Sequence, residues 1–175
     1  MDIVEYLLFV PLLIYGIALS DLFIQWKRFL DPFSWHLPYL FTIVIITDIG
    51  VNNIFEFYKL SLQLKNITYF VYWLYLLPPL LFLMLVNILT NTNESINMET
   101  FFSSKIRIVF LLLAAFIAMH FIPQYKYDQT ILLPRLLGII TCILYAVWHK
   151  KVFFYFIVAV WILAIIKRVY AIYEL

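Results

Sequence analysis

The sequence predicts an all-α integral membrane protein: a single bundle of six transmembrane helices with no soluble domain. Hydrophobic residues make up 66% of the 175 residues and charged residues only 13%, about half the charged fraction of a typical soluble domain. The apolar residues form six blocks, and the charged residues cluster between them. This pattern is expected where lipid surrounds the chain. No connector is long enough to hold a second core, so we expect residues 1–175 to form one domain.

The apolar blocks approach the length of about 20 residues that crosses a bilayer as a helix. We predict spans at residues 3–24, 37–57, 67–90, 106–122, 131–148 and 152–168. The polar residues 91–105 form the longest exposed connector, in which an interfacial helix is one alternative.

The sixth span is short, because Lys167 and Arg168 follow the apolar residues 152–166. We expect this helix to end there, with both basic side chains reaching the membrane surface. The alternative is a longer helix whose two charges face protein.

The N-terminus is predicted to lie outside the cell. No Lys or Arg precedes the first span, whereas Lys27 and Arg28 follow it in the connector, and basic residues are enriched in cytoplasmic connectors. Trp26, Trp35 and Trp148 fall at the same predicted boundary, which is typical of an aromatic belt.

Span two contains a polar stripe. Its members are Asp48, Asn52, Glu56 and Lys59. They follow one another at steps of four or three residues, so on a helix they lie along one side. A carboxylate at mid-bilayer costs a few kcal/mol, so Asp48 is expected to face other helices or water. The stripe is then either a pathway for protons or cations, or a set of hydrogen bonds that ties helices together.

Span three contains Pro78 and Pro79 near its middle. Proline removes a backbone hydrogen bond and clashes with the preceding turn, so we expect a kink or a break. The proline pair is a candidate hinge, and a fixed kink is the alternative.

We expect no cofactor and no metal ion. Cys142 is the only cysteine, which excludes a disulfide or a thiolate cluster within one chain. His36 and His149 are the only histidines at a similar predicted depth, and an interfacial role is favoured for both over haem binding. The chain has no nucleotide-binding or hydrolase motif, and its net charge of +2 does not indicate nucleic acid binding.

Several short motifs resemble an uncharacterised family of small bacterial six-span membrane proteins. They are residues 15–19, 26–30, 35–40, 78–81, 98–102 and 135–138. The resemblance covers most of the chain. It implies the six-span architecture and a bacterial inner membrane, and it carries no activity.

The sequence leaves three function classes open. The first is a non-enzymatic protein, acting as a homo-oligomeric pore or small transporter, or as a membrane subunit of a larger complex. The second is a structural scaffold within the lipid bilayer. The third is an enzyme that acts on a lipid-like substrate, for which Asp48, Glu56 and His120 would be the only groups able to transfer a proton.

Overall fold

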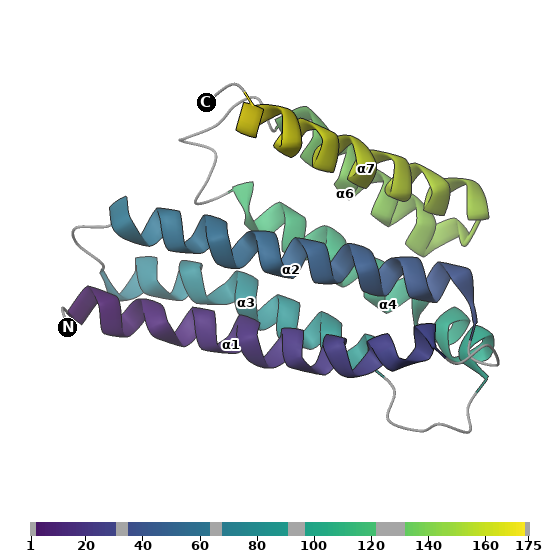
Figure 1. Cartoon of the computed structure of the whole chain (residues 1–175), viewed down its shortest axis with the longest axis horizontal. Coiled ribbons are helices and arrows are strands. Elements are labelled where there is room, and N and C mark those ends of the chain that lie inside the picture. The colour runs from purple at the N-terminus through teal and green to yellow at the C-terminus, as the bar shows by residue number, and fades with distance from the viewer. Residues whose placement is uncertain (1–2, 31–34, 64–67, 91–96, 122–131, 174–175) are drawn as a thin grey trace. The chain divides into compact units, whose positions relative to one another are not determined.

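The computed structural model describes residues 3–30, 35–63, 68–90, 97–121 and 132–173. Regular structure in these ranges is entirely helical (Figure 1). The elements are α1 (Ile3–Gln25), η1 (Trp26–Phe29), α2 (Leu37–Gln63), α3 (Tyr69–Leu89), α4 (Met98–Met119), α6 (Leu132–Trp148) and α7 (Lys151–Tyr173). The chain divides into two compact units, Met1–Lys105 (unit 1) and Ile106–Leu175 (unit 2). The single domain remains a prediction.

Four stretches of helix are long and apolar enough to cross a membrane. They are Phe9–Phe29, Leu37–Tyr58, Tyr69–Leu89 and Met98–Met119. Leu133–Trp148, in α6, is a shorter apolar helix, and α7 carries basic residues near both ends of its described side chains. The chain is therefore a multi-span membrane protein, and the predicted fold class is confirmed as all-helical.

Helix α4 begins before the fourth predicted span. Residues 98–105 were expected in a connector, but they form its first two turns. Asn97 caps this end, because its side-chain oxygen accepts a hydrogen bond from the Glu99 N–H at 2.9 Å. The hydroxyls of Ser103 and Ser104 donate to carbonyls of the preceding turn, so both serines are accommodated within the helix. This part of the connector is therefore helical, as in the alternative of an interfacial helix, and it continues into the predicted span without interruption.

Helix α7 continues beyond its predicted end. It remains helical through Tyr173, past Lys167 and Arg168. The expected end was wrong because Lys and Arg are both good helix formers, and an apolar run follows them. Lys167 is exposed and Arg168 is half-buried.

In unit 1, side chains from α1 and α3 meet the backbone of α2 at Gly50. A Cβ atom on Gly50 would lie 2.5 Å from Cζ of Phe82 and 2.9 Å from Cδ2 of Leu19. The Phe82 ring also packs on the ring of Tyr15, with 5.3 Å between centroids. All four residues are buried. Glycine is therefore required at this position for the three helices to pack closely.

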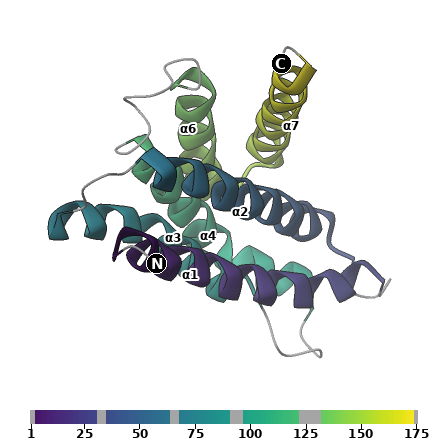
Figure 2. The same cartoon turned by 60° about the vertical axis from the view of Figure 1, so that its left-hand side comes forward.

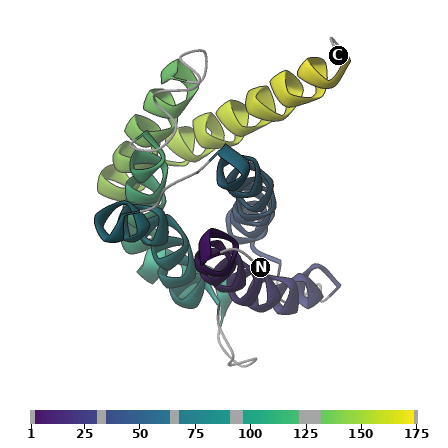
Figure 3. The same cartoon turned by 90° about the vertical axis from the view of Figure 1, so that its left-hand side faces the viewer.

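In unit 2, α6 and α7 form a helical hairpin and diverge away from its turn (Figures 2 and 3). His149 ends α6 with a left-handed φ of 53°, and its N–H donates to the Tyr145 carbonyl at 2.9 Å. The Phe110 ring of α4 packs on Tyr145 and Phe154, with centroids 4.6 and 6.5 Å apart. These three buried rings form a small aromatic core where α4 meets the hairpin.

Candidate functional site

Helix α2 carries the predicted polar stripe on one continuous helix. Asp48, Asn52 and Glu56 lie four residues apart without interruption of the helix, so they follow one side of it. All three side chains are half-buried. Lys59 belongs to α2, but its side chain lies outside the described ones.

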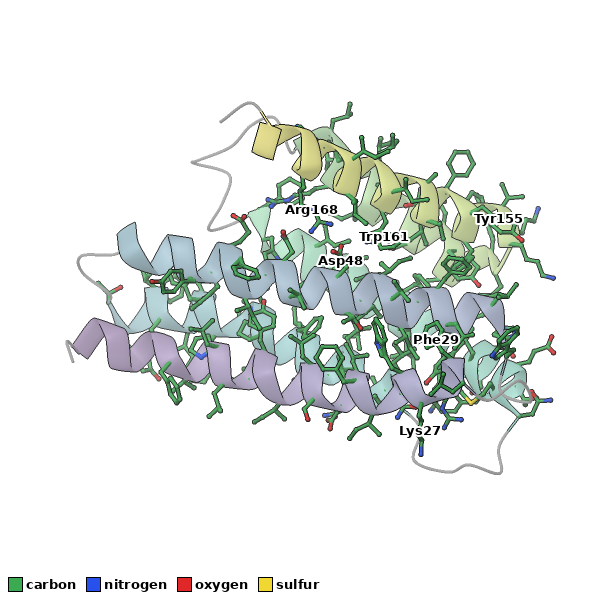
Figure 4. The ribbon with its side chains drawn as sticks, viewed as in Figure 1. Lys27, Phe29, Asp48, Tyr155, Trp161 and Arg168 are labelled. Carbon is green, nitrogen blue, oxygen red and sulfur yellow. The ribbon has the colours of Figure 1, made fainter. Side chains whose placement is uncertain are left out.

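The stripe lies on the side of α2 away from the packing at Gly50. Asp48 precedes Gly50 by two positions, which corresponds to about 200° around the helix axis. Figure 4 shows Asp48 on the side of α2 opposite to α1. The exposed Phe41 and Phe55 lie on the same side as Asp48. The stripe therefore does not belong to the core that α2 forms with α1 and α3.

The stripe has polar interactions within the chain. Asp48 and Glu56 each interact with another group. On a neighbouring side of the helix, the Asn53 side chain donates to the Ile49 carbonyl at 2.7 Å. Such a bond to the preceding turn satisfies an amide in an apolar setting without a partner helix. Asp48 and Glu56, which cannot donate when ionised, need a partner or water instead.

A buried polar cluster joins the end of α1 to α2 and α3, and sequence reasoning missed it. Arg28 is only 4% exposed, and its Nε donates to Oε1 of Gln25 at 2.9 Å. The Tyr39 hydroxyl lies 3.2 Å from the same oxygen and 3.3 Å from the Leu89 carbonyl. Arg28 follows α1, as expected for the connector, but its burial among hydrogen-bond partners was not predicted. Its neighbour Lys27 is exposed (Figure 4).

The hydrogen bonds of this cluster stabilise the ends of helices. Leu89 is the last residue of α3, and a carbonyl at a helix end has no partner within its own helix. Tyr39 lies within reach of that carbonyl, while the Arg28 charge follows the end of α1, where the helix dipole favours a cation. The cluster therefore satisfies polar groups of three helices at one end of unit 1.

The two prolines are buried within α3, which stays helical across both. Of the two predicted outcomes, the break is therefore absent, and the kink remains a prediction. Pro78 and Pro79 each still remove one backbone hydrogen bond. Their role as a hinge remains a prediction.

The histidines occupy three different environments. His36 packs on the Phe102 ring, with centroids 5.7 Å apart, whereas His149 is exposed in the hairpin turn. His120 is buried, and its Nδ1 lies 2.8 Å from the Phe116 carbonyl. Because a carbonyl only accepts, this nitrogen carries the proton. Within the described ranges, no three His, Cys, Asp or Glu residues form a group that could hold a metal ion.

Comparisons of this chain with known protein families, curated protein sequences and solved structures find no match. The resemblance to small bacterial six-span proteins rests on its short motifs and remains a prediction.

Proposed function

We propose that this chain is a non-enzymatic protein of the bacterial inner membrane that crosses the bilayer six times. In this proposal it acts as a homo-oligomeric pore or small transporter, or as the membrane subunit of a larger complex. The observation that supports it is the position of Asp48, Asn52 and Glu56 on the side of α2 away from Gly50.

The electrostatics of the stripe favour a polar pathway. A carboxylate in contact with acyl chains costs a few kcal/mol, and burying a polar group without a hydrogen bond adds to that cost. Water in a pathway, or a polar helix of a neighbouring copy, would lower it. Because the stripe lies outside the core around Gly50, a pathway along it would leave that core intact.

A structural scaffold is the second candidate. It is favoured by the interactions that Asp48 and Glu56 already make within the chain. In this case the two acids stabilise the helices and no solute moves along them.

Flux through reconstituted vesicles distinguishes these two candidates. Asp48→Asn and Glu56→Gln remove the charges while keeping the shape of each side chain. If the stripe lines a pathway, each change should lower proton or cation flux by about tenfold, equivalent to roughly 1.4 kcal/mol. The matched control is Glu99→Gln, which neutralises an exposed acid in the first turn of α4 and should leave flux unchanged.

Thermal unfolding in detergent shows whether each variant remains folded. Vesicles with the unchanged protein that show no flux would contradict the pathway. Flux that survives both stripe substitutions would contradict it as well, and either result would favour the scaffold.

A further inference from the structure

The described part of unit 2 carries only positive charge. Residues 106–121 and 132–173 contain no Asp or Glu. The bases in these ranges are Arg107, Arg135, Lys150, Lys151, Lys167 and Arg168. One end of unit 2 is formed by the turn between α6 and α7. The small aromatic core of Phe110, Tyr145 and Phe154 lies near this turn and shows which bases are at the same end.

Arg107 lies at the level of the hairpin turn. Phe110 of α4 packs on Tyr145 of α6. A second contact joins Ile117 of α4 to Gly138 of α6, because a Cβ placed on Gly138 would lie 3.7 Å from the Ile117 side chain. Ile117 follows Phe110 by seven residues, whereas Gly138 precedes Tyr145 by seven. Helices α4 and α6 are therefore antiparallel, and α4 runs in the same direction as α7. Arg107 precedes Phe110 by three residues, as Lys151 precedes Phe154, so both bases lie about one turn before the aromatic core.

The bases at the turn differ from those towards the other end of unit 2. Arg107, Lys150 and Lys151 are all exposed, as is His149 between the two helices. Towards the other end, Arg135 and Arg168 are half-buried and Lys167 is exposed, and all three interact with another group of the chain. We call Arg107, His149, Lys150 and Lys151 the basic turn. Its charges are directed to the surroundings of the protein.

Exposed apolar side chains adjoin the basic turn. Trp148 is 56% exposed and packs on the Phe153 ring, with 5.3 Å between centroids. Val152, the next residue after Lys151, is also exposed. Tryptophan favours the boundary between headgroups and acyl chains. We therefore expect the lysines next to it to lie at the depth of lipid phosphates, where the start of α7 adds the partial positive charge of a helix N-terminus.

We propose that the basic turn binds the headgroup of an anionic phospholipid. The ammonium groups of Lys150 and Lys151 contact the phosphate oxygens, and Arg107 adds positive charge at the same level. Trp148 and Val152 lie against the acyl chains. A free phosphate ion would satisfy the charges but leave these two apolar side chains uncovered, so a lipid fits the surface better.

Titration of the full-length protein in mixed micelles tests this proposal. Native mass spectrometry would count the bound dioleoylphosphatidylglycerol or dioleoylphosphatidylcholine. We expect the anionic lipid to bind more tightly. Lys150→Gln with Lys151→Gln should weaken its binding about thirtyfold, at about 1 kcal/mol for each base. Lys150→Arg with Lys151→Arg should retain the binding, because the charge is kept.

The matched control is Lys27→Gln with Lys167→Gln, which removes two charges from exposed positions elsewhere and should leave lipid binding nearly unchanged. Equal binding of the two lipids would overturn the proposal. An equal loss in the control pair would also overturn it, since binding would then depend on net charge alone. Displacement of the lipid by excess inorganic phosphate would indicate a site for the free oxyanion instead.

Discussion

Units 1 and 2 place their charges differently. Residues 1–105 contain eight acidic and five basic residues, whereas residues 106–175 contain two acidic and seven basic residues. Unit 1 has an acid in the middle of an apolar helix, at Asp48, and buries Arg28 among hydrogen-bond partners. Unit 2 exposes bases at a turn between helices. A charge inside a span requires a specific partner, whereas a charge at the turn needs only the membrane surface.

Substitution of a glycine by alanine should show the largest difference in stability between the two units. Gly50→Ala would place a methyl group 2.5 Å from the Phe82 ring, whereas Gly138→Ala meets only Ile117 at an ordinary 3.7 Å. We expect Gly50→Ala to destabilise the protein by about 1–3 kcal/mol through overpacking. Gly138→Ala should be neutral, or stabilise by up to about 1 kcal/mol through helix propensity. Thermal unfolding in detergent measures both, and equal midpoints would contradict the difference in packing.

Two buried tyrosines provide a smaller contrast. The Tyr39 hydroxyl has polar partners in unit 1. Within the described residues, the Tyr145 hydroxyl of unit 2 makes no hydrogen bond, although its ring is buried. Tyr39→Phe should therefore cost about 1 kcal/mol and Tyr145→Phe close to nothing. The same unfolding measurement would refute this if Tyr145→Phe proved the more damaging change.

Cysteine labelling should leave stability almost unchanged and test whether both units cross the membrane. In a Cys142→Ala background, single cysteines would replace the exposed residues Leu30, Tyr69, Glu99 and Lys150. An impermeant maleimide should label positions 30, 99 and 150 from one side and position 69 from the other. Labelling of positions 69 and 150 from the same side would mean that unit 2 does not cross as predicted.

The sequence predicted where helices lie better than where they end. An apolar block indicates a segment long enough to cross the lipid, and each of the six predicted blocks corresponds to a helix. Helix α4 begins eight residues early because Asn97 caps it and its serines bond to the helix backbone. Helix α7 extends past Lys167 because a base at the edge of lipid does not end a helix. Neither helix end could be predicted from the hydropathy of the sequence.

The candidate site was predictable only in part. The four-residue steps of Asp48, Asn52 and Glu56 required nothing beyond helix geometry to place them on one side of α2. The difference between Lys27 and Arg28 could not be predicted, because adjacent bases look alike in sequence. Only the fold shows that Arg28 points towards Gln25 and is buried, while Lys27 remains exposed.

Cys142 is buried in α6 and is the only thiol of the chain. A small alkylating reagent can reach it only when the packing around it opens transiently. The rate of alkylation therefore reports the opening equilibrium of the structure around Cys142, when closing is fast relative to modification. The chain thus carries its own reporter of local unfolding at α6.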